Sequence, residues 1–218
     1  RGDTIAFIGS TGSGKSTLIN LIPRFYDISS GSIRIDNVDV RRYDLKALRE
    51  KIGFIPQKAL LFTGSINENI RYGKHNAVQT EVEHSAKVAQ AYDFITEKPK
   101  QFEEMIEEGG GNVSGGQRQR LSIARAVVRK PDIYIFDDSF SALDFKTDAN
   151  LRKQLKYETK DAITLIVAQR VTSIMDATRI IVLNEGAVVG IGTHRELLKT
   201  CSIYHEIALS QLSEEELA

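Results

Sequence analysis

Hydrophobic residues occur along this chain in short runs, separated by longer stretches in which apolar positions recur with helical spacing. Short apolar runs that alternate with helical patterns are typical of a mostly parallel sheet flanked by helices. An α/β fold is therefore expected. The predicted strands lie at 4–8, 52–55, 132–136, 163–168, 179–183 and 187–191.

Local turn and helix signals refine this pattern. Apolar residues alternate over 33–40 around Asp36-Asn37, which predicts a small hairpin. The last two predicted strands are joined by the turn-forming residues 184–186 and should pair as a second hairpin. A helix after the first strand should stop at Pro23, and the capping box at 193–196 should open a C-terminal helix.

The middle of the chain has a different character. Residues 65–71, 81–91 and 116–129 have helical patterns, and no convincing strand lies among them. The expected organisation is a single domain over 1–218. Residues 1–58 and 131–218 would form the α/β core, and residues 59–130 an inserted helical subdomain. The end of the chain, 213–218, is expected to fray.

Composition narrows the functional classes. The chain of 218 residues has 29 basic and 29 acidic residues, so charge gives no argument for a nucleic-acid partner. No apolar run approaches the roughly 20 residues that cross a bilayer, so another segment or chain would span any membrane. The single cysteine, Cys201, excludes a disulfide framework and is compatible with a reducing compartment.

The strongest chemical signal is the pattern Gly-x4-Gly-Lys-Ser at 9–16, between a predicted strand and a predicted helix. Its glycines allow backbone N–H groups to turn toward phosphate oxygens, and the helix N-terminus adds a positive dipole. Lys15 would reach the β- and γ-phosphates, and the Ser16 hydroxyl would bind Mg²⁺. The alternative is a glycine-rich turn that binds nothing, which the strand–loop–helix context disfavours.

A second signal is the pair of acids, Asp137 and Asp138, that ends the apolar strand at 132–136. Beside a phosphate-binding loop, a carboxylate at the C-terminal end of a parallel strand is placed to hold Mg²⁺. Asp137 is the candidate for this role, and Asp138 would act on the attacking water. Without the phosphate-binding loop, an acidic turn that merely caps the strand would be the simpler interpretation.

The segment 113–117, Val-Ser-Gly-Gly-Gln, resembles the signature motif of ABC ATPases, with valine in place of the usual leucine. Gln57 resembles the Q-loop glutamine of that family, and 141–144 its D-loop. The acidic segment 107–110 and the segment 61–70 are similar to the exporter subgroup. These motifs occur in the family's order over essentially the whole chain, so the fold is expected to be a P-loop NTPase core of the ABC type.

The resemblance implies that two such domains pack head-to-tail and enclose two ATP molecules. The signature residues of one domain would contact the γ-phosphate held by the other. The nucleotide-binding residues would be Thr11, Gly12, Ser13, Gly14, Lys15, Ser16, Thr17 and Gln57; the metal ligands Ser16, Gln57 and Asp137; the residues acting in trans Ser114, Gly115, Gly116 and Gln117; the D-loop residue Asp144; and the catalytic residues Asp138 and Gln169.

The sequence departs from the family at two of these positions. Asp138 stands where competent members carry glutamate, and Gln169 where they carry histidine. An aspartate is shorter by one methylene, and glutamine cannot become a cation as histidine can. Both changes together resemble the degenerate half of a heterodimeric exporter. This predicts an ATPase site that binds Mg·ATP but hydrolyses it slowly, paired with a second, non-identical ATP-binding domain.

Other questions stay open in the sequence. The chain could instead be a non-hydrolytic, ATP-gated clamp that completes a partner's catalytic site. The expected location is the cytoplasmic face of a membrane, with a transmembrane domain either fused or separate. A DNA-repair or translation ATPase is disfavoured because there is no coiled-coil insertion or second ATPase copy. The aromatic residue that stacks on adenine in the family precedes the phosphate-binding loop, outside this sequence.

Overall fold

A computed structural model describes residues 1–213 of the chain. The strands are β1 (Thr4–Ile8), β2 (Arg34–Ile35), β3 (Val38–Asp39), β4 (Ile52–Ile55), β5 (Gly64–Ser65), β6 (Met105–Ile106), β7 (Ile133–Asp137), β8 (Ile163–Val167), β9 (Arg179–Asn184) and β10 (Ala187–Gly192). The helices are α1 (Lys15–Asn20), α2 (Leu45–Glu50), α3 (Ile66–Arg71), α4 (Gln79–Val88), α5 (Tyr92–Thr96), α6 (Gly115–Arg129), α7 (Phe145–Glu158), α8 (His194–Thr200) and α9 (Ser202–Leu209).

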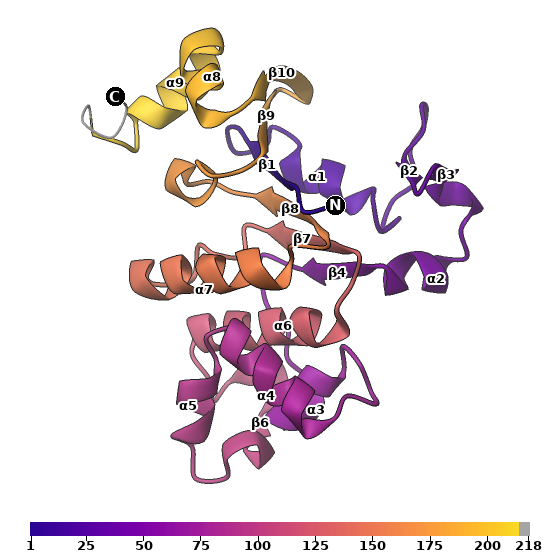
Figure 1. The fold of residues 1–218 in the computed structure, drawn as a ribbon, viewed down its shortest axis with the longest axis vertical. Coiled ribbons are helices and arrows are strands. Elements are labelled where there is room, and N and C mark those ends of the chain that lie inside the picture. Colours follow the sequence, from indigo (N-terminus) through magenta and orange to yellow (C-terminus); the bar gives the residue numbers. More distant parts are fainter. Residues whose placement is uncertain (214–218) are drawn as a thin grey trace.

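The main sheet has six strands in the order β10-β9-β1-β8-β7-β4 (Figure 1). The pairs β9–β1, β1–β8, β8–β7 and β7–β4 are parallel, and only the β9–β10 hairpin is antiparallel. The small hairpin predicted around Asp36-Asn37 is the β2–β3 pair. The structure thus confirms an α/β fold with a mostly parallel sheet and a small antiparallel part.

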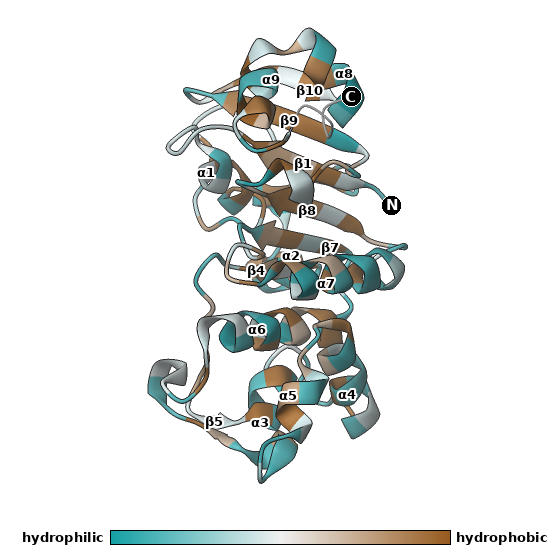
Figure 2. Ribbon diagram, turned by 90° about the vertical axis from the view of Figure 1, so that its left-hand side faces the viewer, coloured by the Kyte–Doolittle hydropathy of each residue, from teal (hydrophilic) through white to brown (hydrophobic). Residues whose placement is uncertain are grey.

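The hydrophobic pattern explains why the sheet is covered on both faces. All five residues of β7 are buried, and the side chains of its four apolar residues alternate between two clusters. Ile133 and Ile135 belong to a cluster with Ile19 of α1 and Leu48 of α2. Tyr134 and Phe136 belong to the larger cluster, which includes residues of α6 and α7. In Figure 2 the sheet strands are accordingly coloured hydrophobic along much of their length.

The segment between β4 and β7 lies beyond the β4 edge of the sheet, where α3, α4, α5 and α6 pack together (Figures 1 and 2). The three helices expected there are present as α3, α4 and α6. The expectation that the segment has no strand was wrong, because Gly64–Ser65 pairs with Met105–Ile106 in a two-residue antiparallel ladder. A pairing of two residues is too short to produce a period-2 pattern in sequence.

Several helices were not anticipated. They are α2, α5 and α7, and the predicted C-terminal helix is divided at Cys201 into α8 and α9. The helix predicted at 81–91 instead spans Gln79–Val88, and it ends before Gln90, whose φ is +57°. The end expected to fray lies outside the described residues, apart from Ser213.

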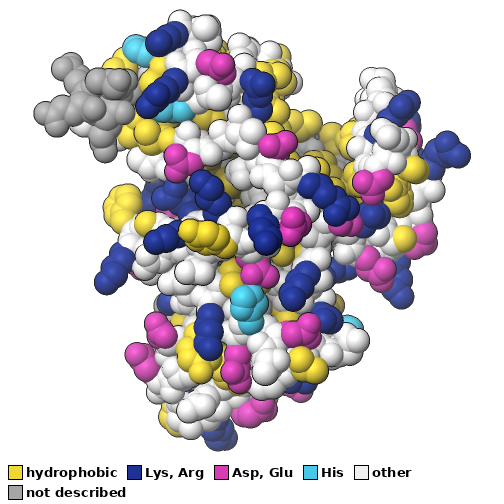
Figure 3. Space-filling view, viewed as in Figure 1, with side chains coloured by type: hydrophobic (Ala, Val, Ile, Leu, Met, Phe, Trp, Pro, Cys, Tyr) yellow, Lys and Arg dark blue, Asp and Glu magenta, His cyan; other side chains and the backbone are white. Residues whose placement is uncertain are grey.

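The described surface has no dominant sign of charge on the face shown in Figure 3, where basic and acidic side chains are interspersed.

None of the helices formed by residues 1–213 combines the length and apolar character that a bilayer crossing requires.

Candidate nucleotide-binding site

The loop between β1 and α1 is built around glycines that the local geometry demands. A Cβ on Gly9 would lie 2.0 Å from the carbonyl oxygen of Leu183 in β9, so only glycine fits. Gly14 caps α1 with a φ of +94°, a conformation that favours glycine. The loop therefore turns tightly from the centre of the sheet into the first turn of α1, with the helix N-terminus at its mouth.

Lys15 is held within this loop. Its ammonium Nζ donates to the carbonyl oxygens of Gly9 (2.9 Å) and Ser10 (2.7 Å) and to Ser13 Oγ (3.2 Å). Burial lowers the pKa of Lys15, while the negative charges of Asp138 and Asp137 oppose that shift. The ammonium is thus held by the loop within electrostatic range of two carboxylates, and it can exchange its loop contacts for phosphate oxygens.

Ser16 and Asp137 meet although they are far apart in sequence. The Ser16 hydroxyl donates to Asp137 Oδ1 at 2.7 Å. Neighbouring oxygens in an octahedral Mg²⁺ shell are about 3 Å apart, so this pair fits two adjacent ligand positions. Within residues 1–213, no three His, Cys, Asp or Glu side chains converge as metal ligands. A Mg²⁺ ion here would accordingly share its shell with phosphate oxygens and water, as such ions usually do.

Asp138 is the most constrained side chain of the site. Its Oδ2 accepts hydrogen bonds from Gln57 Nε2 at 2.9 Å and from Gln169 Nε2 at 2.7 Å. Its backbone is left-handed, with a φ of +47°, and its N–H donates to the carbonyl of Val167 in β8. Burial raises the pKa of Asp138, an effect that the Gln57 hydrogen bond opposes.

The topology explains this convergence. Each part of the site lies at the end of a different strand. The P-loop follows β1, Gln169 follows β8, Asp137 and Asp138 lie at the end of β7, and Gln57 follows β4. These four strands are neighbours in the parallel part of the sheet. The C-terminal ends of parallel strands form one edge, where ligands of open α/β sheets bind. Thr11 and Gly12 are exposed in the same loop, Thr17 is exposed near the start of α1, and Ser13 is buried.

The signature-like residues form a separate group at the start of α6, beyond the β4 edge of the sheet. Ser114 Oγ accepts from the Gln117 backbone N–H (3.2 Å), and Gln117 Oε1 accepts from the Ser114 N–H (3.0 Å), which completes a capping box. Because its oxygen accepts this bond, the Ser114 hydroxyl proton remains free to donate outward. Gly115 is exposed at the first turn of α6.

The D-loop-like segment lies next to this group. A Cβ on Gly116 would be 3.3 Å from the carbonyl oxygen of Ala142, so the two segments touch. Asp144 caps α7 by accepting from the Thr147 N–H at 2.9 Å, and this bond lowers the pKa of Asp144. An unforeseen contact links α6 to the Q-loop, since Gln119 Nε2 donates to the carbonyl of Pro56. No local sequence pattern predicts that pairing, because its partners are 63 residues apart.

Comparison with known proteins agrees with this geometry. A profile of the ABC transporter family matches residues 1–141. An uncharacterized ABC transporter ATP-binding protein of Mycobacterium tuberculosis is 46% identical over 213 residues, which cover 96% of this chain and 36% of the relative. A putative multidrug export ATP-binding/permease protein of Staphylococcus aureus is 44% identical over 207 residues, covering 95% of this chain and 36% of the relative.

Among solved structures, a bacterial Atm1-family ABC exporter with ATP bound superimposes with a TM-score of 0.95 at 36% sequence identity. The match covers 98% of this chain and 38% of that one. The chain therefore spans a little over a third of the length of the relatives it matches. The family match over most of the chain, the parallel sheet and the phosphate-binding loop agree: this chain belongs to the ABC transporter family, as one of its ATP-binding domains.

Proposed function

We propose that this chain binds Mg·ATP in the loop at 9–16, pairs head-to-tail with a second ATP-binding domain and powers export across a membrane. The observation that carries the proposal is the separation of two groups of hydrogen-bond donors that are suited to phosphate. The first surrounds Lys15 at the sheet edge, and the second surrounds Ser114 at the start of α6. If both serve a γ-phosphate, the second must serve the nucleotide of another domain.

The roles at the first group follow from its chemistry. The backbone N–H groups of 11–17 and the Lys15 ammonium would bind the phosphates. Ser16 and Asp137 would bind Mg²⁺ directly or through water, and the Gln57 side-chain oxygen would contribute another ligand. We assign this work to a core of 1–58 and 131–218, and the signature to a helical subdomain of 59–130.

We further propose that this site retains ATP and hydrolyses it slowly. Asp138 would have to orient the attacking water, yet its Oδ2 already accepts from both Gln57 and Gln169. An aspartate also ends about 1.5 Å short of where a glutamate carboxylate would lie, and a misplacement of that order costs about 10²-fold in rate. Gln169 can donate to a γ-phosphate as a neutral amide but cannot carry a proton away from it.

The second group would then complete a more active site on a non-identical partner. The outward-facing Ser114 hydroxyl, together with the N–H groups of Gly115 and Gly116 at the N-terminus of α6, forms a donor set suited to a γ-phosphate. Gln117 would act indirectly, by fixing Ser114 through the capping box. Asp144 would lie at the same interface, because its segment touches Gly116.

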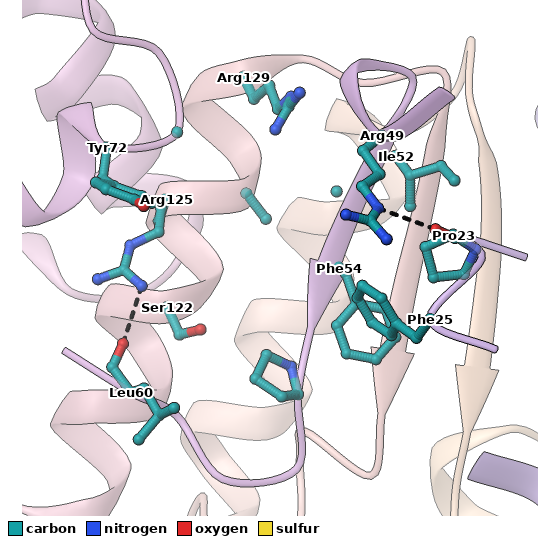
Figure 4. A pocket seen from close by; sticks show the side chains of 14 residues that line it. Pro23, Phe25, Arg49, Ile52, Phe54, Leu60, Tyr72, Ser122, Arg125 and Arg129 are labelled. Atoms are coloured by element: carbon teal, nitrogen blue, oxygen red, sulfur yellow. Dashed lines mark hydrogen bonds between the residues drawn. The ribbon is translucent and has the colours of Figure 1, made fainter. Parts of the chain in front are cut away.

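We propose that a groove beside β4, lined by residues of β4, α6 and the turn after α1, contacts a transmembrane domain, either fused or separate, at the cytoplasmic face of the membrane. Figure 4 shows this cavity of about 270 Å³ between β4, α6 and the turn after α1. Phe25 packs edge-on against Phe54 with ring centroids 5.2 Å apart, and both Phe25 and Tyr72 are about half exposed. Arg125 donates to the Leu60 carbonyl at the opposite wall. Such a half-exposed apolar groove is suited to an amphipathic partner segment.

Two substitutions test the proposal in the assembled protein because they affect different sites. Lys15→Ala should abolish ATP binding at this chain's own site and leave hydrolysis at the partner's site dependent on Ser114. Ser114→Ala should preserve ATP binding here and slow hydrolysis at the partner's site by about 10²-fold, as loss of a preorganised donor does. If both variants affect the same nucleotide, the head-to-tail arrangement is wrong.

The clamp alternative rests on the same doubly bonded Asp138. It predicts that ATP and a non-hydrolysable β,γ-imido analogue, bound selectively at this site, support the partner's activity equally. A slow but required hydrolysis here would instead make the analogue stall turnover after one cycle.

A further inference from the structure

The side chain of Gln211, just after α9, bridges the loop that carries Gln169. Gln211 Nε2 donates to the Gln169 carbonyl oxygen at 2.8 Å, and Gln211 Oε1 accepts from the Val171 backbone N–H, also at 2.8 Å. The primary amide therefore bonds to two residues of the loop at 169–173, which we call the switch loop. Two well-formed bonds from one planar group fix both the position and the orientation of this backbone.

The switch loop needs such support because it lies beyond the sheet. β8 ends at Val167, and the N–H of Ala168 still bonds to the Phe7 carbonyl of β1. From Gln169 onward the backbone leaves this ladder, although the Gln169 side chain must reach Asp138 at 2.7 Å. Val171 is fully buried, so an unpaired N–H at this residue would destabilise the folded protein. Gln211 supplies the acceptor.

Gln211 is itself well anchored. The N–H groups of Gln211 and Leu212 both donate to the carbonyl of Ala208, which continues the turn of α9. Ala208, Leu212 and Tyr204 are buried in the larger core cluster, and Tyr204 is hydrogen-bonded to His194 of α8 at 2.7 Å. The bridging amide thus extends from a packed helical pair rather than from a free end.

We propose that Gln211 is a positioning residue that holds Gln169 in reach of both Asp138 and the γ-phosphate of bound ATP. Through it, the C-terminal helices α8 and α9 set the geometry of the nucleotide site. This proposal rests on the proposed function, in which Gln169 contacts the γ-phosphate. It adds that the preference of the site for ATP over ADP depends on a residue outside every recognised motif of the chain.

Neighbouring contacts supply controls that do not involve Gln169. Arg152 of α7 donates to the Thr172 carbonyl at 3.1 Å while its Nε bonds to Asp148. Arg152→Ala removes a bond to the same loop but leaves both Gln211 bonds in place. It should therefore loosen residue 172 without changing nucleotide preference.

The test compares Gln211→Ala with Gln211→Glu in the protein in its native assembly. The glutamate carboxylate can still accept from the Val171 N–H but cannot donate to the Gln169 carbonyl. Affinities are measured for the β,γ-imido analogue of ATP and for ADP, and amide hydrogen exchange is followed over the switch loop. Both variants should weaken binding of the ATP analogue by about five-fold, the effect of one hydrogen bond, and leave ADP binding unchanged.

The exchange data distinguish the positioning of Gln169 from a role in which Gln211 only accepts a hydrogen bond from the Val171 N–H. The Val171 amide should exchange faster in Gln211→Ala and remain protected in Gln211→Glu. On a Gln169→Ala background, neither Gln211 variant should reduce ATP-analogue binding further, because the group it positions is gone.

Each contrary result has a distinct meaning. Wild-type ATP preference in Gln211→Glu overturns the role of the Gln169 bond, as does unchanged exchange of the switch loop in Gln211→Ala. If Gln169→Ala itself leaves the ATP preference intact, the assigned contact between Gln169 and the γ-phosphate fails. In that case the exchange data alone decide whether Gln211 positions the loop.

Discussion

The contact between Asp138 and Gln169 predicts that the two departures from the family are coupled. We consider the substitutions Asp138→Glu and Gln169→His, alone and together. Gln169 Nε2 lies 2.7 Å from Asp138 Oδ2, already at hydrogen-bonding distance. A glutamate would advance the carboxylate by about 1.5 Å, one C–C bond. The longer acid therefore has no room along this line while Gln169 keeps its place.

The magnitude follows from this steric conflict. With Gln169 in place, Asp138→Glu must displace either its own carboxylate or the glutamine, so we expect hydrolysis to rise only about three-fold. Gln169→His alone places an imidazole beside an acid that is still too short, and a similar small gain is expected. Together they should raise hydrolysis about 10²-fold, the usual effect of correcting a misplacement of this size. The excess over the product of the single effects corresponds to an interaction free energy of about 1 kcal/mol or more.

The assay is single-turnover hydrolysis of radiolabelled ATP in the assembled dimer, with the partner's own site disabled so that only this site is measured. Single effects that simply multiply to give the double effect would refute the coupling. A double variant no faster than the wild type would refute the slow-site hypothesis altogether.

Three further outcomes follow from the structure. Gly9→Ala should lower the free energy of unfolding by more than about 2 kcal/mol, because the added Cβ would lie 2.0 Å from a carbonyl oxygen. The added Cβ of Gly12→Ala meets open space, so this substitution should lower the free energy of unfolding by only about 1 kcal/mol, the cost of an alanine at positive φ. Equal losses for the two variants in urea titrations would contradict this contrast. Ser114→Ala should lower the free energy of unfolding by about 1 kcal/mol, because it removes the side chain that caps α6. Gln117→Ala removes only the bond from the Ser114 N–H to Gln117 Oε1 and should lower the free energy of unfolding by less. The reverse order in the same assay would contradict the assigned cap. Burial raises the pKa of Asp138, so this carboxyl binds a proton more tightly in the folded protein than in the unfolded chain, and its charged form opposes folding at neutral pH. Asp138→Asn should therefore be more stable than the wild type at pH 7. This difference in stability should shrink as the pH falls through the folded-state pKa of Asp138. A margin that is constant or grows between pH 7 and pH 4 would rule out burial of this charge as its cause.

Most of the sheet was predictable because strands such as β1, β4 and β7 are largely buried and so appear as apolar runs. The predicted runs at 4–8 and 52–55 coincide with β1 and β4, and those at 179–183 and 187–191 differ from β9 and β10 by one residue. The omitted helices lack a comparable signal. In α7, only Asp148, Leu151 and Leu155 are buried, and its other face is polar. Helix α2 has six residues and a single buried one, Leu48.

The components of the site were predictable for a different reason. Strand–loop–helix context places the P-loop, and parallel topology brings strand ends to one edge, so the grouping of Lys15, Ser16 and Asp137 follows from sequence order. The hydrogen bonds did not follow. Convergence of Gln57 and Gln169 on one oxygen of Asp138 depends on side-chain conformations, and so does the link from Gln119 to Pro56.

The pairing of β4 with β7 also constrains how the chain folds. Ile52 lies opposite Ile133 in this parallel pair, so the two strands become neighbours only after the long intervening segment has been closed into a loop. That segment contains its own closely packed helices, whose contacts are local and form quickly. Early association of α3, α4 and α6 would bring the ends of the segment together and reduce the entropic barrier to β4–β7 docking. Truncation of the buried Ile123 should then slow refolding, whereas truncation of Val182 in the β9–β10 hairpin should mainly speed unfolding, and stopped-flow measurements would show the difference.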